Sequence, residues 1–129
     1  MTTNHFATVS TPSAPQMASF PQATKVADLI YTSGQVGINV GTSEREETFR
    51  DEVHRAIDHL EAVLEAGGSA LSAVVKTTCY LSSMDLYPEF DALYRERFAA
   101  PMPGRSTVQC GLARNFRFEI EAIARVIRE

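Results

Sequence analysis

The stretch Pro103-Gly104-Arg105-Ser106-Thr107-Val108, followed by Phe118-Glu119-Ile120-Glu121-Ala122-Ile123-Ala124, decides how this chain folds. The second segment alternates apolar residues with others at a period of two, which is typical of a half-buried strand. Proline and glycine before Arg105 allow the first strand to begin abruptly. We therefore expect two strands, with Arg105 at the start of the first.

Arg105 and the two glutamates of the second strand are the first candidates for chemistry. An arginine at a strand end presents a planar fork of donors that suits a carboxylate. Glu119 and Glu121 interrupt an apolar strand, where a carboxylate is usually paired, solvated or functional. Spacing alone leaves open whether Arg105 is functional or is a structural ion-pair partner.

The spacing of apolar residues and of turn-forming residues predicts the remaining helices, strands and turns of the chain. Residues 1–21 are rich in loop-forming residues, with a brief edge strand at His5–Val9, and Gly37–Ser43 has turn composition. A glycine at position 34 suggests a bulge or a close backbone approach. The other expected elements are a hairpin of Thr24–Val26 and Leu29–Thr32, a helix over Glu46–Ala66 ended by Gly67-Gly68, a central strand over Ala73–Ser82 and a second helix over Leu86–Phe98. Helices that follow strands pack on one face of a sheet and leave the other open, which a small domain can cover by oligomerising.

Length and charge restrict the class of protein. The 129 residues predict one domain over 1–129, and the formal net charge of −4 with scattered basic residues argues against a nucleic-acid surface. No apolar run is long enough to span a bilayer, and we expect a cytoplasmic location. Cys79 and Cys110 are expected to be reduced and mostly buried, and the three histidines lack the spacing of a metal site.

Four segments in order resemble the reactive-intermediate (imine/enamine) deaminase family, also called the YjgF-type or Rid family. They are Thr32-Ser33-Gly34-Gln35, Val74-Val75-Lys76-Thr77-Thr78, the Arg105 segment and Glu119-Ile120-Glu121-Ala122-Ile123-Ala124. The similarity runs from about Pro15 to the end. It implies an α+β, chorismate-mutase-like domain with a mixed, mostly antiparallel sheet and two helices on one face. It also implies a homotrimer with sites between subunits.

The resemblance also implies roles for individual residues. Arg105 matches the family's carboxylate anchor, and Glu119 matches the glutamate that positions a water, with an ion pair to Arg117 as the structural alternative. Ser33 matches a pocket serine, and Thr107 stands where many members have a cysteine. Two departures concern the substrate. Phe20 replaces a tyrosine of the pocket wall, and Asp91, which falls where a common relative has asparagine, would repel an anionic substrate if it faced the pocket.

The implied activity is hydrolytic deamination of enamines and imines, such as 2-aminoacrylate and 2-iminopropionate, to keto acids and ammonia. Such a reaction requires a held carboxylate, a placed water and moving protons. No metal or other cofactor is expected, and the expected partners are a small carboxylate-bearing substrate and further copies of the chain. Two alternatives stay open: deamination of a larger, aminomuconate-type substrate, and a non-catalytic ligand-binding or chaperone-like trimer.

Overall fold

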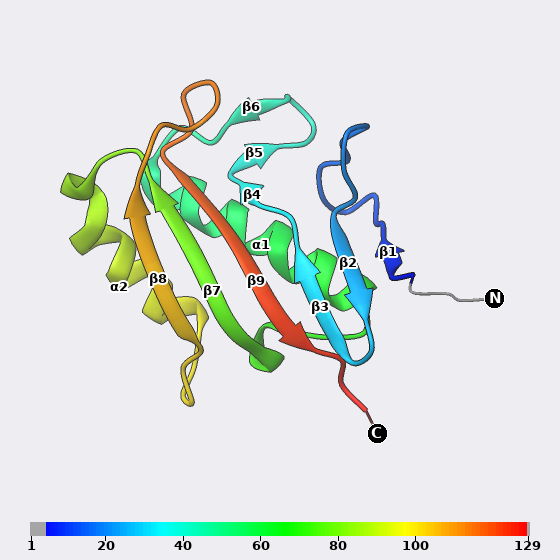
Figure 1. Ribbon diagram of the computed structural model, residues 1–129. Coiled ribbons are helices and arrows are strands. Elements are labelled where there is room, and N and C mark those ends of the chain that lie inside the picture. Colours follow the sequence, from blue (N-terminus) through cyan, green and yellow to red (C-terminus); the bar gives the residue numbers. More distant parts are fainter. Residues whose placement is uncertain (1–4, 129) are drawn as a thin grey trace.

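A computed structural model describes residues 5–128, which form a seven-stranded mixed sheet with two α-helices on one face and a separate two-stranded sheet (Figure 1). The sheet order is β1-β2-β3-β9-β7-β8, and β4 also pairs with β9. Strands β7 and β8 are parallel, and the other pairs of this sheet are antiparallel. The strands are β1 (Ala7–Val9), β2 (Ala23–Val26), β3 (Leu29–Thr32), β4 (Gln35–Val36), β7 (Val74–Leu81), β8 (Gly104–Gln109) and β9 (Phe118–Arg125). The α+β architecture, the edge strand β1, the hairpin β2–β3 and the central position of β7 confirm the sequence-based predictions.

Helices α1 (Phe49–Ala66) and α2 (Tyr87–Arg97) lie behind the sheet in Figure 1. Helix α1 packs mainly on β9 and β4, and it also contacts α2. The core lies between α1, α2 and the sheet, where β9 contributes alternate residues. The fully buried large side chains include Ile30, Ile57, Leu60, Leu64, Leu81, Phe90, Tyr94, Phe118 and Ile120. The period-two pattern of β9 thus decides which face of the sheet is covered.

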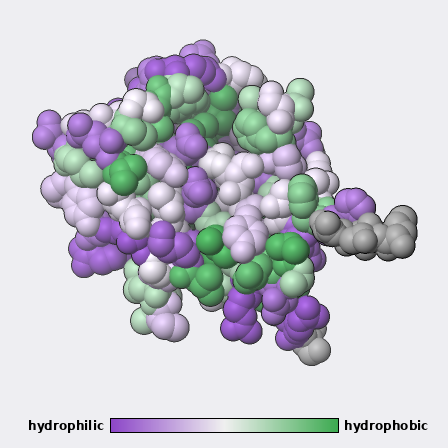
Figure 2. Space-filling model, in the orientation of Figure 1, coloured by the Kyte–Doolittle hydropathy of each residue, from purple (hydrophilic) through white to green (hydrophobic). Residues whose placement is uncertain are grey.

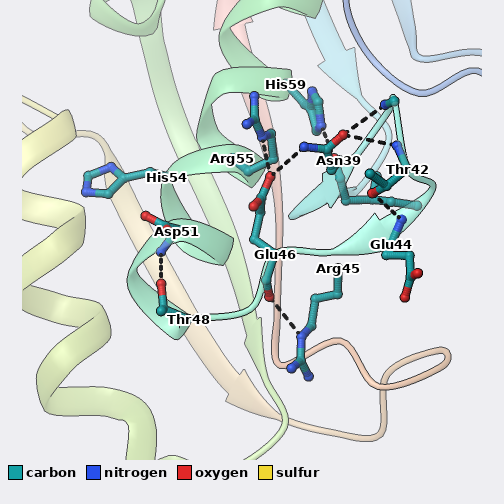
Figure 3. A network of polar contacts seen from close by, with 12 residues as sticks. Asn39, Thr42, Glu44, Arg45, Glu46, Thr48, Asp51, His54, Arg55 and His59 are labelled. Atoms are coloured by element: carbon teal, nitrogen blue, oxygen red, sulfur yellow. Dashed lines mark hydrogen bonds and ion pairs between the residues drawn. The ribbon is translucent and has the colours of Figure 1, made fainter.

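Helix α1 begins three residues later than the sequence predicts. Thr48 is its N-cap, with its hydroxyl accepting a hydrogen bond from the backbone N–H of Asp51. Glu46 lies before the helix, where its Oε2 accepts hydrogen bonds from Arg55 Nε at 2.9 Å and Asn39 Nδ2 at 3.3 Å (Figure 3). Glu46 is thus bound to Asn39 and to Arg55 of α1 itself while it lies outside the helix, and the Thr48 cap marks the later start. The helix ends at Ala66, and Gly68 follows with a φ of 88°.

The region predicted as a turn contains a small hairpin as well. Strands β5 (Ile38–Asn39) and β6 (Glu44–Arg45) form a separate two-stranded sheet. Its turn is held by Asn39 Oδ1, which accepts hydrogen bonds from the backbone N–H groups of Gly41 and Thr42. His59 on α1 contacts the carbonyl oxygen of Ile38 at 2.8 Å, and Figure 3 shows His59 beside Asn39 of the hairpin. The hairpin is thereby fixed beside β4 and α1. Two short 3-10 turns, Leu71–Ala73 and Met84–Leu86, precede β7 and α2.

Glu52 is a fully buried carboxylate that ties α1 to the start of β9. Its Oε2 accepts a hydrogen bond from the backbone N–H of Arg117, and its Oε1 accepts one from Arg117 Nε, both at 2.7 Å. Arg45 Nε lies 3.9 Å from the same Oε1. A buried carboxylate is tolerated when its oxygens are paired in this way. The ion pair therefore positions the chain immediately before Phe118 and Glu119.

We expect Glu52→Gln to destabilise the fold by roughly 1.5–3 kcal/mol, the range for hydrogen bonds to charged groups. The amide removes the charge and places an NH₂ donor against the donors of Arg117. Urea denaturation followed by circular dichroism measures the change. Glu96→Gln is the control, because Glu96 pairs with Arg50 on the surface, with both side chains about half exposed. Equal denaturation midpoints for both variants would contradict this role of Glu52.

The second face of the sheet is open along its full width, and Figure 1 views the molecule from this side. Glu119, Glu121 and Ile123 of β9 point to this face, because they alternate with the buried residues. Figure 2 shows mixed polar surface across the strands and apolar surface toward the lower end. Exposed large side chains on this face or at its rim include Val26, Tyr31, Val75 and Val108. The prediction that the helices cover one face alone is confirmed.

The two cysteines differ in environment. Cys79 on β7 is fully buried, and burial raises the pKa of its thiol to about 12. Cys110 follows β8 and is exposed, so the prediction that both thiols are mostly buried was wrong for Cys110. The reason is its position at the end of an edge strand, where nothing in the described chain packs over it. No helix within residues 5–128 has the length and hydropathy needed to cross a membrane.

Candidate functional site

Arg105 lies near the start of β8 and points to the helix side of the sheet. Its register partner on β7 is Thr77, which is fully buried against α2 and contacts the hydroxyl of Tyr94 at 2.8 Å. The guanidinium carbon lies 4.7 Å from the ring centre of Tyr94 and 5.0 Å from that of Phe90. Stacking against aromatic rings holds the planar group in place while 18% of the side chain stays exposed. The predicted position at a strand end is confirmed.

Two side chains of α2 contact the guanidinium of Arg105 directly. Its Nη2 donates a hydrogen bond to the hydroxyl of Tyr87 at 2.6 Å, and its Nη1 lies 2.9 Å from Oδ1 of Asp91. Burial acts to lower the pKa of Arg105, but the hydrogen bond to Asp91 and the nearby negative charge outweigh it and raise the pKa. Asp91 is therefore an ion-pair partner of Arg105, which is the structural alternative for this arginine. Tyr87 was missed from the sequence, although it lies one helical turn before Asp91.

Thr107 lies on the same side of the sheet as Arg105, two residues further along β8. Its partner on β7 is Cys79. The hydroxyl oxygen of Thr107 is buried and has no hydrogen-bond partner among residues 5–128. An unpaired buried hydroxyl is unfavourable by about 1–3 kcal/mol, so such groups need a partner from elsewhere. The structure thus groups Arg105, Thr107, Tyr87 and Asp91.

Glu119 belongs to a second group on the open face of the sheet. It lines a cavity of about 290 Å³ together with Phe20, Gly34, Gln35 and Phe116. The backbone of Gly34 lies so close to the Glu119 carboxylate that a Cβ atom at this position would displace it. This confirms the expectation that Gly34 meets another surface. Figure 2 shows apolar surface at the upper end of the sheet, near β4, β5 and the β8–β9 loop.

The carboxylate of Glu119 is half-buried and has no ion-pair partner within the described residues 5–128. The alternative of an ion pair with Arg117 was wrong, because Arg117 is bound to Glu52 on the other side of the sheet. Burial, and secondarily the negative charge of Glu121, raises the pKa of Glu119. Glu121 itself accepts a hydrogen bond from the Tyr80 hydroxyl at 2.8 Å, which agrees with a structural role. Of the two glutamates of β9, Glu119 is therefore the one without an ion-pair or hydrogen-bond partner in the part of the chain that the structure describes.

The raised pKa of Glu119 predicts a pH profile for any reaction in which it acts as a base. A base must be ionised, so activity should fall on acidification at a pH above the usual range for glutamate. Glu121→Gln removes one cause of the shift and should move this acid limb to lower pH. The profile of kcat/KM against pH for both proteins measures it. An acid limb that stays in place in Glu121→Gln would contradict the electrostatic coupling.

Ser33 uses its hydroxyl within the chain. Its Oγ donates a hydrogen bond to the carbonyl oxygen of Pro21 at 2.7 Å, and its backbone N–H donates one to the carbonyl of Gln22. These bonds hold the segment that carries Phe20, an exposed residue. Ser33 and Phe20 thus lie on the Glu119 side of the molecule, and Ser33 positions the cavity wall.

The sequence-predicted residues therefore form two groups on opposite sides of one sheet. Arg105 and Thr107 face α2, whereas Glu119, Phe20 and Ser33 adjoin the open face and its upper end. Tyr80 pairs with Glu119, while the adjacent Cys79 shares the side of Thr107. No cluster of three or more histidine, cysteine or acidic side chains within residues 5–128 could hold a metal ion. A single chain does not bring Arg105 and Glu119 together.

The family model described as Endoribonuclease L-PSP matches residues 11–126. The chain is 40% identical over 118 residues to 2-iminobutanoate/2-iminopropanoate deaminase from Dermatophagoides farinae, covering 89% of this chain and 92% of the relative. The protein of the same name from Escherichia coli K12 is 30% identical over 122 residues, covering 91% and 95%.

Among solved structures, RidA from the Antarctic bacterium Psychrobacter sp. PAMC 21119 superposes with a TM-score of 0.89 at 30% identity. The match covers 93% of this chain and 99% of that protein. The similarity in sequence and in fold thus extends over nearly the whole chain, including both groups of residues described above.

Proposed function

Because the chain belongs to the Endoribonuclease L-PSP family, the YjgF/Rid family of its deaminase relatives, we propose that it hydrolyses small imino acids to keto acids and ammonia. The observation that carries this proposal is the state of Glu119. It is a half-buried carboxylate with a raised pKa and no ion-pair partner among residues 5–128, beside a cavity lined largely by apolar side chains. Such a group suits general-base catalysis near neutral pH.

In the proposed reaction, an enamine first tautomerises to the imine, whose carbon is electrophilic. With the imine in its protonated (iminium) form, Glu119 accepts a proton from water as the water oxygen bonds to that carbon, and the electrons of the C=N bond move to nitrogen, giving a neutral carbinolamine group. The C–N bond then breaks with proton transfer to nitrogen, which releases ammonia and leaves the keto acid. Arg105 binds the substrate carboxylate and fixes its orientation. Thr107 supplies its unpaired hydroxyl beside the substrate, and Phe20 and Ser33 form and support the opposite wall.

We propose that the two groups of residues meet between subunits of a homotrimer. The open face carries exposed apolar side chains, and β8 is an edge strand whose outer backbone groups have no partner among residues 5–128. A neighbouring copy could cover both and bring its Arg105 to Glu119. Light scattering at micromolar concentration should give the mass of three chains, and the mass of one chain would contradict the interface site.

The activity is tested by generating imines in the reaction mixture. An amino-acid oxidase converts alanine or 2-aminobutanoate to the imine, and the protein should accelerate release of keto acid and ammonia above the uncatalysed rate. Product formation at the uncatalysed rate over a range of imines would contradict the proposal. The alternatives of a larger substrate or a non-catalytic trimer are not favoured by the relatives' names. The family description includes a ribonuclease, but a net charge of −4 gives no support for RNA binding.

A further inference from the structure

Asp91 changes the electrostatic character of the proposed carboxylate anchor. Its Oδ1 lies 2.9 Å from Nη1 of Arg105, and the two charges cancel at the place where a substrate carboxylate would bind. The second oxygen, Oδ2, lies 3.6 Å from Nε of Arg95, whose side chain is 69% exposed. Solvent screens that outer pair strongly, so it offsets little of the negative charge. The pair Arg105–Asp91 is therefore close to neutral as a unit.

The guanidinium still has donors for a ligand. Of its five N–H groups, one points to the Tyr87 hydroxyl and one faces Asp91, which leaves three. A carboxylate needs two for bidentate binding, so a substrate can bind without displacing Asp91. The substrate carboxylate would then lie near the carboxylate of Asp91. This proximity is unfavourable for a ligand that carries only negative charge.

A ligand that carries a positive and a negative charge is attracted by both members of the Arg105–Asp91 pair. A cationic nitrogen one bond from the carboxylate-bearing carbon can approach Asp91 while the carboxylate binds Arg105. With this proposed function as its premise, we infer that Asp91 is a specificity-determining residue that selects zwitterionic substrates over simple monocarboxylates. The protonated iminium form of an imino acid is such a zwitterion, and the keto-acid product is not. The same pair would thus favour binding of the reactive species and release of the product.

Two ligands with one carbon skeleton test the inference without turnover. L-2-aminobutanoate is zwitterionic, whereas 2-oxobutanoate is a monoanion of the same length. Isothermal titration calorimetry on the full assembled protein gives a dissociation constant for each, and their ratio reports the selectivity. In Asp91→Asn, which keeps the shape of the side chain, we expect the preference for the amino acid to fall by roughly three- to tenfold, chiefly through tighter 2-oxobutanoate binding.

Matched variants separate the charge of Asp91 from other effects. Asp91→Glu keeps the charge and should keep most of the preference. Arg95→Ala removes the outer, solvent-screened cation and should leave the preference unchanged. An unchanged ratio in Asp91→Asn would overturn the inference while leaving the proposed function intact. Arg105→Ala should weaken the binding of both ligands. If both ligands bind the Arg105→Ala protein as tightly as they bind wild type, or if neither binds wild type, Arg105 is not the carboxylate anchor. The inference about Asp91 then fails as well.

Discussion

We expect Glu119→Gln to lower turnover of imino acids by roughly two to four orders of magnitude, the range that a positioned general base supplies. Glutamine keeps the volume and the hydrogen-bonding capacity of the side chain but cannot accept a proton from water. Because the carboxylate is unpaired within residues 5–128, its replacement breaks no ion pair there, and the fold should persist. The rate of keto-acid formation from enzymatically generated imine measures the loss.

Glu121→Gln is the matched control for this experiment. Glu121 lies two residues further along β9 on the same face, and the amide can still accept the hydrogen bond from the Tyr80 hydroxyl. Turnover near the optimal pH should therefore stay close to that of wild type. A Glu119→Gln protein with wild-type turnover would mean that another group handles the water, and that the raised pKa of Glu119 reflects burial alone.

Replacement of Arg105 should give the second largest loss. We expect Arg105→Ala to reduce kcat/KM by roughly two orders of magnitude, because charge-assisted hydrogen bonds and substrate orientation are both lost. Arg105→Lys should raise KM less than Arg105→Ala does, but it should still lower kcat, since a point charge does not fix a carboxylate in one orientation. Steady-state kinetics over a range of imine concentrations separate the two effects.

The fold should survive both changes at position 105. Asp91, which loses its partner, has a third of its side chain exposed and can be solvated. Arg95→Ala, at the exposed end of the same ion-pair chain, is the control and should retain the kcat/KM of wild type. Equal acceleration by wild type and both Arg105 variants would place the carboxylate anchor elsewhere.

The local pattern of the sequence predicted most of the fold. Alternation along β9, the apolar stripe of α1 and the glycines after Ala66 depend on neighbours in sequence, and each led to the observed element. The start of α1 was missed because the side chain of Glu46 is bound by Asn39 of β5 and by Arg55, nine residues further along within α1 itself. The β5–β6 hairpin was missed because strands of two residues are too short to show a periodic pattern in the sequence.

The site could be predicted residue by residue but not in its spatial arrangement. The side of the sheet to which Glu119 points follows from the alternation along β9, but β8 is exposed or half-buried throughout, so its own sequence does not show to which side Arg105 points. The pairing of β8 with β7 decides this, because it places Arg105 beside the buried Thr77. The pairing of Asp91 with Arg105 and that of Arg117 with Glu52 are likewise tertiary contacts. Arg117 precedes β9, so strand alternation does not extend to its side chain.

Because Arg105 and Glu119 lie on opposite sides of the sheet, a chain that lacks one of them still carries the other intact. If neighbouring copies complete each site, two inactive proteins should complement each other. Subunits of Arg105→Ala and Glu119→Gln, mixed in equal amounts, unfolded and refolded together, should regain about one quarter of wild-type activity, the share of sites that receive both native residues. Refolding each variant alone should restore none, and a mixture as inactive as its components would mean that both residues act within one chain.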